Sequence, residues 1–116
     1  MTTPTALIVD DEPDILELLE LTLARMDINT RKAGDLTEAK RWLERESFQL
    51  CLTDMRLPDG DGLDLVDHIQ AHFPELPVAV ITAHGNMEAA VRALKSGAFD
   101  FVSKPVDLKI LRKLVS

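Results

Sequence analysis

The stretch LIVDD, residues 7–11, is a short apolar run that ends in the acidic pair Asp10 and Asp11. Three later apolar runs also end in side chains that can bind a metal or a phosphate: CLTD at Asp54, VAVIT at Thr82 and FDFVSK at Lys104. If these four runs are parallel strands, the five side chains meet at the carboxyl edge of one sheet, where open α/β sheets place their ligands. Three carboxylates beside a hydroxyl and an ammonium group predict a site for a divalent metal ion and a phosphoryl group.

Short apolar runs alternate with longer amphipathic segments along the whole chain. We expect strands over residues 6–9, 28–33, 50–53, 78–82 and 99–102. We expect helices over residues 13–26 and 35–46, from after Gly62 to residue 72, over 86–96, and from 107 onward, the last still running at Ser116. This alternation predicts a parallel sheet covered by helices on both faces, with right-handed crossovers.

Helix-capping residues, glycines and prolines support these boundaries. Asp35 and Glu38 have the spacing of a capping box at the start of the second helix. Gly97 stands where a left-handed residue would end the fourth helix. Pro58, Gly60 and Gly62 indicate a loop before the third helix.

The composition bounds the class of protein. A chain of 116 residues with 46% hydrophobic content can bury one core, so we expect one domain. The formal net charge of -7 argues against contacts with nucleic acid. The single cysteine, Cys51, excludes an internal disulfide and fits a reducing cytoplasm. The N-terminus does not resemble a secretory signal, and no apolar stretch approaches the roughly 18 residues of a membrane span.

Within the predicted site, Asp11 and Asp54 are expected to bind a metal directly, and Asp10 through a water molecule. Mg²⁺ prefers a compact octahedron of oxygen ligands. Carboxylates this close repel one another, so without metal the pKa of at least one should rise. A bound metal reverses that tendency and leaves Asp54 ionised as a nucleophile. The Lys104 ammonium and the Thr82 hydroxyl can bind the phosphoryl oxygens.

The motifs IVDDE, LTDMRLPDGDG, ITAHG and GAFDFVSKP together resemble the receiver domain of bacterial two-component response regulators. The resemblance covers residues 1–116. It implies an α/β fold that is flavodoxin-like and doubly wound, with a five-stranded parallel sheet in the order 2-1-3-4-5 and five helices. It also implies a phosphoryl-accepting switch rather than a turnover enzyme, with Mg²⁺ or Mn²⁺ as the cofactor.

The same resemblance assigns roles to single residues. Asp54 matches the residue that accepts a phosphoryl group from a sensor histidine kinase. The metal ligands would be Asp10, Asp11, Asp54 and the backbone carbonyl of Arg56. Lys104 matches the lysine that pairs with the phosphate, Thr82 the switch hydroxyl, and Phe101 the switch aromatic residue.

A narrower resemblance joins this chain to receivers of sigma-54-dependent transcription activators, the NtrC-like type, and most of all to regulators of type IV pilin expression. The matching stretches are TDMRLPDGDGLDLV and TAHGNMEAAVRALKSGAFDFVSKPVD. The resemblance implies an ATPase domain and a DNA-binding domain beyond residue 116, and a homodimer that phosphorylation either forms or dissolves.

Three other protein classes are alternatives to a receiver domain, and each is weighed against the acidic residues of this sequence. A flavin-binding flavodoxin would need a phosphate-cradling loop after the first strand, where DDEPD stands instead. A haloacid-dehalogenase-type phosphatase would have its two aspartates separated by one residue, whereas Asp10 and Asp11 are adjacent. A pseudo-receiver that only binds partners would not need the complete set of acidic residues, threonine and lysine.

Several polar residues have a weaker claim to a role. His68 and His72 have an i, i+4 spacing that can bind metal, but no third ligand stands nearby in the sequence, and a solvated helix face is the favoured interpretation. Cys51 is interpreted as a small core residue. Arg56 and His84 follow the site aspartate and threonine by two residues, so both could reach the rim of the site or lie in solvent.

Overall fold

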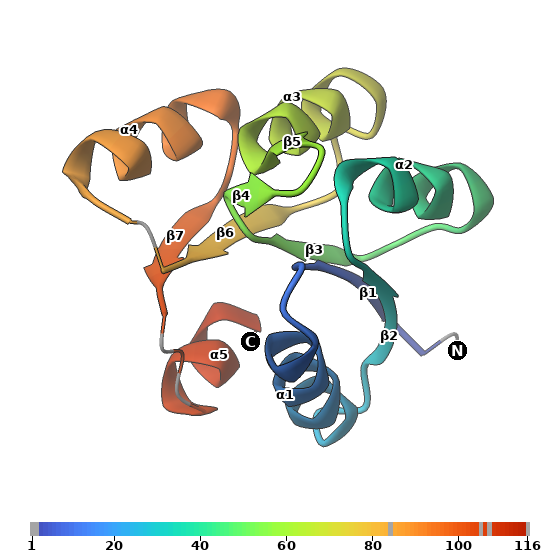
Figure 1. Cartoon of the computed structure of the whole chain (residues 1–116). Helices are drawn as coiled ribbons and strands as arrows, with labels where there is room; N and C mark the ends of the chain where they lie inside the picture. Colours follow the sequence, from blue (N-terminus) through green and yellow to red (C-terminus); the bar gives the residue numbers. More distant parts are fainter. Residues whose placement is uncertain (1–2, 84, 105, 107, 116) are drawn as a thin grey trace.

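The structure, a computed structural model, describes residues 3–83, 85–104, 106 and 108–115. Its centre is a five-stranded parallel sheet in the order β2-β1-β3-β6-β7 (Figure 1). The strands are β1 (Thr5–Val9), β2 (Asn29–Ala33), β3 (Leu50–Thr53), β6 (Val78–Thr82) and β7 (Asp100–Ser103). Counted along this sheet alone, the order is 2-1-3-4-5, which confirms the predicted flavodoxin-like fold.

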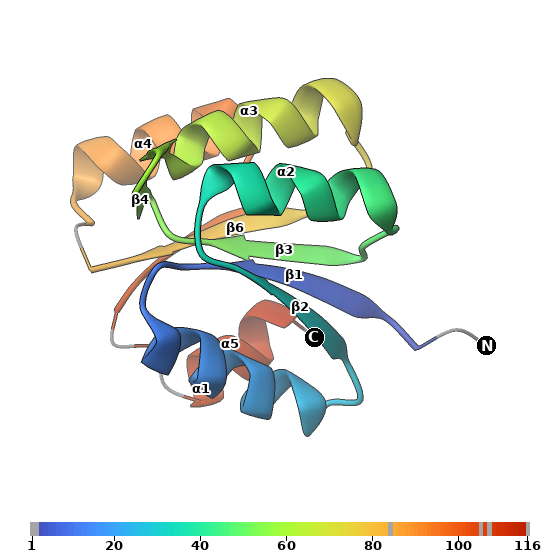
Figure 2. The same cartoon turned by 45° about the vertical axis from the view of Figure 1, so that its right-hand side comes forward.

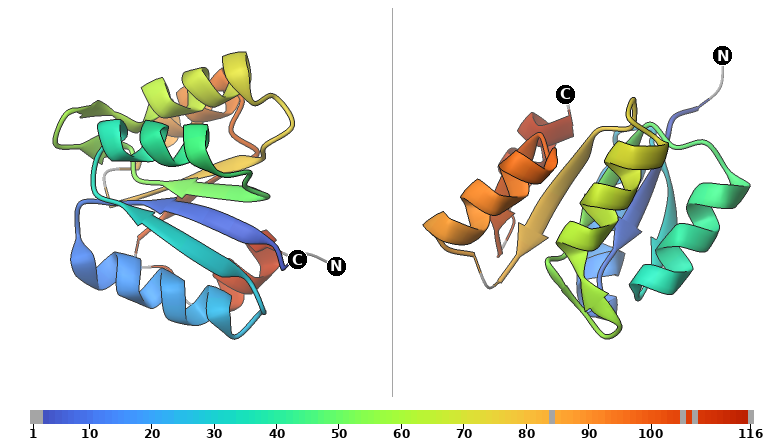
Figure 3. Two further views of the ribbon diagram at one scale, coloured as in Figure 1. Left: turned by 90° about the vertical axis from the view of Figure 1, so that its right-hand side faces the viewer. Right: turned by 90° about the horizontal axis from the view of Figure 1, so that it is seen from above.

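Five helices cover the two faces of the sheet, as a doubly wound fold requires. Helices α1 (Pro13–Ala24) and α5 (Leu108–Val115) lie on one face (Figures 1 and 3). Helices α2 (Leu36–Arg45), α3 (Gly62–His72) and α4 (Met87–Ser96) lie on the other (Figure 2). None of the helices in the described part of the chain is long and apolar enough to cross a membrane.

The two faces of the sheet contribute to two separate cores. In β1, Leu7 and Val9 pack into the cluster beneath α2, α3 and α4, whereas Ala6 and Ile8 pack into the cluster beneath α1 and α5. All residues of β3 and β6 are buried. Burial on both faces explains why these strands are continuous apolar runs rather than alternating ones.

The register of the sheet brings the carboxyl ends of its strands to one edge. Val9 pairs with Thr53, and Thr82 pairs with Ser103. The residues that follow, Asp10, Asp54 and Lys104, therefore leave the sheet at the same edge. This common edge is the feature of the fold that positions the site.

Helix ends follow the capping chemistry expected from the sequence. The Asp35 carboxylate accepts a hydrogen bond from Glu38 N at 2.8 Å, and the Asn86 side chain accepts one from Ala89 N at 2.7 Å. Glu38 Oε1 accepts from the N–H of Gly34 at 2.7 Å, so the return bond of the capping box falls one residue early. Gly97 ends α4 with a left-handed φ of 118°.

The region predicted as a loop around Pro58, Gly60 and Gly62 contains a small antiparallel hairpin, β4 (Arg56–Leu57) and β5 (Gly60–Asp61). At its turn, the Asp59 carboxylate accepts hydrogen bonds from Leu36 N at 2.8 Å, Thr37 N at 3.0 Å and Thr37 Oγ1 at 2.8 Å. The hairpin is thus tied to the first turn of α2. A local turn pattern does not reveal such a long-range bond, which is why the prediction missed it.

Several predicted boundaries differ from the structure by one or two residues. Helix α1 ends at Ala24 instead of Met26, and the chain turns through Asp27, whose φ is 60°. The N–H of Asp27 donates to Ala24 O at 3.1 Å, and the N–H of Ile28 donates to Leu23 O at 3.0 Å, which is a Schellman motif. Strand β2 therefore starts after Ile28, and β7 spans Asp100–Ser103 rather than 99–102. The predicted helix start at Asp107 and its end at Ser116 lie outside the described residues.

Candidate functional site

Asp54 follows β3 directly and lies at the centre of the sheet edge. Its backbone N–H donates to Val9 O at 2.8 Å, which extends the pairing of β1 and β3 by one residue. Its carboxylate Oδ1 accepts from Met55 N at 2.6 Å and from Arg56 N at 3.4 Å. The residue is 5% exposed. The backbone of Met55 and Arg56, which leads into the following hairpin, therefore holds this carboxylate in one orientation.

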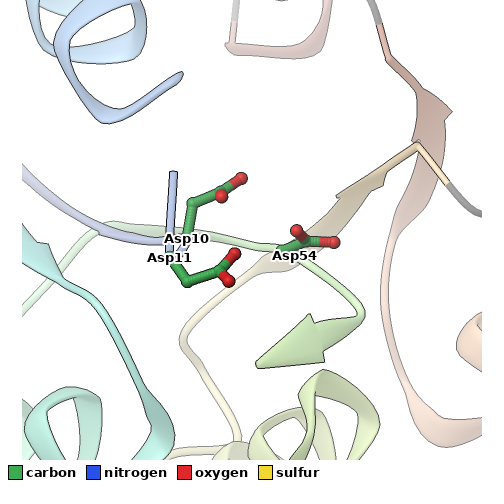
Figure 4. Close-up of side chains that lie close together, drawn as sticks. All are labelled: Asp10, Asp11 and Asp54. Carbon is green, nitrogen blue, oxygen red and sulfur yellow. The ribbon is translucent and has the colours of Figure 1, made fainter. Parts of the chain in front are cut away.

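Asp10 and Asp11 follow β1 and present their carboxylates toward Asp54 (Figure 4). Each of the three residues offers an oxygen, and these oxygens lie within 4.8 Å of one another. Asp10 is 2% exposed and its Oδ1 accepts from Glu12 N at 2.9 Å, whereas Asp11 is exposed. The structure brings together the three carboxylates that the sequence predicts.

Lys104 connects two of these carboxylates. Its Nζ donates to Asp10 Oδ2 at 2.7 Å and to Asp54 Oδ2 at 3.2 Å, and the Lys104 side chain is 7% exposed. Glu12 Oε1 lies 4.0 Å from the same nitrogen, at the outer limit of an ion pair. A buried ammonium shared between two carboxylates offsets part of the negative charge of the cluster.

Burial and charge shift two pKa values in this cluster. Burial raises the pKa of Asp10 above its usual 3.8, and the Asp54 charge adds to the rise, although the hydrogen bond from Lys104 opposes it. The expected upward shift is therefore found, with burial rather than repulsion as its main cause. Burial lowers the pKa of Lys104, but the hydrogen bond and charge of Asp10, with a smaller contribution from Asp54, outweigh it and leave that pKa raised.

Thr82 and Phe101 lie on the neighbouring strands β6 and β7. Thr82 ends β6, is fully buried, and its carbonyl accepts from Lys104 N at 2.9 Å. Phe101 pairs with Val80 in the sheet and packs, half-buried, against the core beneath α2, α3 and α4. An ideal Cβ placed on Gly85 would lie only 2.9 Å from Cε1 of Phe101. The loop between β6 and α4 thus rests directly on this ring.

Gly62 is a site-forming residue that the sequence reasoning treated only as part of a loop. Its N–H donates to Met55 O at 2.7 Å, and a Cβ at this position would lie 1.9 Å from the backbone oxygen of Asp54. Only glycine allows the start of α3 to approach the site backbone so closely. The signal in the sequence was the second glycine of the run DGDG, residues 59–62, which marks a position where the backbone can approach another segment closely.

The remaining candidates separate into those near the site and those far from it. The Arg56 side chain is exposed, while its backbone N–H faces Asp54. Cys51 is completely buried, and burial raises the pKa of its thiol to about 12, which makes it an inert core residue. His68 and His72 lie on α3, away from the sheet edge. His84 lies outside the described residues.

The donor set of the cluster fits a hard divalent cation. Three carboxylates supply only oxygen ligands, which Mg²⁺ and Mn²⁺ prefer over nitrogen or sulfur. Among the residues that the structure describes, this is the one group of three or more acidic, histidine or cysteine side chains close enough to hold a metal together. The arrangement can therefore combine a metal, an anionic nucleophile and an ammonium group within one small volume.

Comparisons with known proteins agree with this geometry. Residues 6–116 match the family model described as the response regulator receiver domain. The response regulator protein PilR of Pseudomonas aeruginosa is 62% identical over 116 residues, which are 100% of this chain and 26% of PilR. The chain spans about a quarter of the length of the curated relatives it matches.

Solved structures give the same result. A CheY-like receiver domain protein of Methanospirillum hungatei superposes with a TM-score of 0.93 at 28% identity, covering 98% of this chain and 91% of that one. The receiver domain dimer of beryllofluoride-activated NtrC4 superposes with a TM-score of 0.88 at 35% identity, covering 96% and 90%.

Proposed function

The chain belongs to the response regulator receiver domain family, the signalling domains of two-component systems, and we propose that its Asp54 accepts a phosphoryl group from a sensor histidine kinase. The observation that carries this proposal is the buried Asp54 carboxylate, held beside Asp10, Asp11 and the Lys104 ammonium at the sheet edge. Phosphoryl transfer requires mainly positioning and charge neutralisation, and this cluster supplies both.

The transfer itself exchanges one bond to phosphorus for another. The Asp54 Oδ2 oxygen, which accepts from Lys104 Nζ before the reaction, attacks the phosphorus and forms the O–P bond, while the N–P bond breaks and its electron pair leaves with the kinase imidazole. Lys104 then moves its hydrogen bond from Asp54 to the new phosphoryl oxygens, while Asp10 keeps it close. The backbone N–H groups of Met55 and Arg56 keep the Asp54 side chain oriented during the reaction.

A divalent metal, Mg²⁺ or Mn²⁺, completes this site in the proposed function. Asp11 and Asp54 would bind it directly, Asp10 through water, and the backbone carbonyl of Arg56 would add a further oxygen. Supporting this division, Asp10 already accepts hydrogen bonds from Lys104 and Glu12 N, whereas Asp11 is exposed. When bound, the metal neutralises charge on the phosphoryl group.

The phosphorylated state would be transmitted through Thr82 and Phe101. The Thr82 hydroxyl would turn toward the phosphoryl oxygens, and Phe101 would repack in the volume it leaves. Because Gly85 lies close to the Phe101 ring, a movement of that ring would change the contact that supports the loop before α4. The conformational change would therefore reach α4, β7 and α5.

The surface formed by α4, β7 and α5 would carry the response to a second copy and to an output domain. Exposed apolar side chains support this role: Met87 is 80% exposed, Leu94 51%, Val91 42% and Ile110 41%. The NtrC4 receiver is described as a dimer when activated by beryllofluoride. We propose a homodimer here too, within a longer cytoplasmic sigma-54-type activator that carries ATPase and DNA-binding domains, with the receiver acting as a switch rather than a turnover enzyme.

The test is phosphorylation of the purified chain by acetyl phosphate with Mg²⁺. Intact-mass spectrometry should show one added phosphoryl group on the wild-type chain and none on Asp54→Asn. The control is Asp64→Asn, which removes an exposed carboxylate from α3 and should be labelled like the wild type. Labelling of Asp54→Asn to the wild-type extent would contradict the assignment.

A further inference from the structure

The strand β2 forms one end of the sheet and pairs there with β1 (Figure 1). The N–H of Asn29 and the carbonyl of Ala33, at the two ends of β2, form hydrogen bonds of 2.9 and 3.0 Å with the residues that flank β1. Because the backbone groups of successive strand residues point to opposite sides of the strand, those of Thr30 and Lys32 point away from β1. These two residues therefore form the open edge of the sheet.

Side chains occupy both of the carbonyls on this open edge. The indole Nε1–H of Trp42, on α2, donates a hydrogen bond to Lys32 O at 3.1 Å. The Arg31 guanidinium donates through Nη1 to Thr30 O at 3.2 Å. The two outward-facing carbonyls of β2 thus already have the kind of hydrogen bond that another strand would supply.

Further contacts hold this cover in place. The Arg31 guanidinium carbon lies 5.6 Å from the centroid of the Trp42 ring, within the range of a cation–π contact. Arg31 Nε also donates to Glu46 Oε1, at the end of α2, at 3.0 Å. From the other face of the sheet, Glu20 on α1 forms an ion pair with Lys32 at 3.2 Å. Helices on both faces therefore bind side chains of the edge strand.

An uncovered edge strand is a template for pairing with another strand, and the nearest source of one is a second copy of the same chain. Two β2 strands related by a two-fold axis would run antiparallel, and Thr30 of each copy would exchange hydrogen bonds with Lys32 of the other. The two Arg31 side chains would then stand opposite each other, which their like charges disfavour.

We propose that Trp42 and Arg31 close the β2 edge against pairing with the β2 strand of a second copy of this chain. Trp42 and Arg31 act by occupying the outward-facing carbonyls, and Arg31 adds a positive charge at the centre of the strand. Self-association of the chain is thereby directed to other surfaces. The proposal involves no residue of the phosphoryl site, so it does not depend on the proposed function.

The experiment opens the edge in the double variant Arg31→Thr with Trp42→Phe. Threonine removes the guanidinium and its charge, and phenylalanine keeps an aromatic ring without the indole N–H donor. Sedimentation velocity without beryllofluoride should show concentration-dependent self-association beyond that of the wild-type chain. Hydrogen exchange measured by NMR locates the contact: the Thr30 and Lys32 amides should exchange about tenfold more slowly once most chains are paired. A dimer formed through the face of α4 would leave the exchange of these two amides unchanged.

Three further variants control for charge, for the place of contact and for folding. Arg41→Thr removes an equal charge from an exposed position on α2 and should behave like the wild type. Lys32→Pro, added to the double variant, deletes an outward-facing N–H and should restore the wild-type sedimentation. Arg31→Thr alone keeps Trp42 and its packing, and should show the same changes as the double variant to a smaller extent.

Two results would overturn the proposal. One is wild-type exchange of the Thr30 and Lys32 amides both in Arg31→Thr and in the double variant, with folding checked by circular dichroism. The other is self-association of the double variant that Lys32→Pro leaves unchanged, because the chains would then meet at another surface.

Discussion

At the scale of single residues, the site depends on a few side chains held in one arrangement by backbone donors. Asp10 accepts a hydrogen bond from one backbone N–H and Asp54 from two, and Lys104 donates to both carboxylates. Gly62 contributes by having no side chain, because any Cβ would collide with the backbone oxygen of Asp54. Buried charges are tolerated here only because each has a partner of opposite sign or a hydrogen bond.

One residue outside the site has an unfavourable backbone conformation. Asp27 has a φ of 60°, the left-handed region in which glycine is unstrained and other residues are not. Asp27→Gly should raise the free energy of unfolding by about 0.5–1 kcal/mol, and Asp27→Ala should lower it. Urea denaturation followed by circular dichroism measures both changes. Asn29→Gly, a glycine placed in the exposed edge strand β2, is the control and should destabilise the chain. A less stable Asp27→Gly chain would show that the aspartate side chain is needed at this turn.

At the scale of secondary-structure elements, the β4–β5 hairpin links the site to the helices around it. It starts two residues after Asp54, and Asp59 at its turn caps α2. Asp61 at its end caps α3 through Leu63 N at 2.8 Å and lies 3.9 Å from the Arg92 guanidinium on α4. The hairpin therefore contacts all three helices on this face.

The cap at Asp59 should make the stability of α2 depend on pH. Hydrogen bonds from Leu36 N and from the hydroxyl and N–H of Thr37 hold the pKa of Asp59 below its usual 3.8. Because the folded pKa is the lower one, the stabilisation is fully present above about pH 4 and is lost as the pH falls through the folded pKa. The wild-type chain should thus be more stable than Asp59→Asn at pH 7, and the difference should shrink below pH 4 in urea denaturation. Asp67→Asn removes the same charge from α3, and its difference in stability from the wild-type chain should not follow this pH dependence. If the difference between the wild-type chain and Asp59→Asn stayed constant with pH, the capping role of Asp59 would be contradicted.

The conformational response that passes from the end of β6 to α4 should depend on the Thr82 hydroxyl. Thr82→Ala retains Asp54, the other carboxylates and Lys104, so it should still bind beryllofluoride with Mg²⁺. NMR shift changes from Val91 to Phe101 should be large in the wild-type chain and strongly attenuated in Thr82→Ala, because no hydroxyl is drawn toward the phosphoryl mimic. Thr22→Ala is the matched control, since it removes a buried threonine hydroxyl from α1 and should leave the response unchanged. Equal responses in Thr82→Ala and wild type would mean that the signal takes another route.

At the scale of the whole molecule, two helices on the same face of the sheet differ in how firmly they are packed. Helix α3 buries five residues, whereas α4 buries only Ala89 and Ala93 and keeps its larger apolar side chains exposed. Small side chains bury little apolar area, so moving α4 costs less than moving α3. Helix α4 is therefore the element best suited to change position, and its exposed face is available to a second copy.

The exposed face of α4 should control the oligomeric state. Leu94→Glu places a charge in the proposed interface, where burial without a partner is unfavourable. Sedimentation velocity with and without beryllofluoride should show a change of oligomeric state in the wild-type chain and none in Leu94→Glu. Leu21→Glu, an equal change at an exposed leucine of α1, should behave like the wild type. If Leu94→Glu showed the same change of oligomeric state as the wild-type chain, this face would be excluded as the interface.

The sequence by itself determined the fold class, the order of the helices and strands, and four polar residues that lie together at the sheet edge, Asp10, Asp11, Asp54 and Lys104. The reason is that parallel strands buried on both faces must be continuous apolar runs, and each run here ends in a polar residue at the same sheet edge. The motifs that these residues form also indicated the family, which the comparisons confirm. Caps at Asp35 and Gly97 were predictable too, because they depend on local geometry alone.

Only the tertiary structure decided the features that join segments distant in sequence. The bond from Asp59 to the start of α2, the contact of Gly85 with Phe101, and the approach of Gly62 to Asp54 all depend on how the elements pack. A periodic pattern specifies which face of a helix is buried, but not which side chain of another helix lies opposite it.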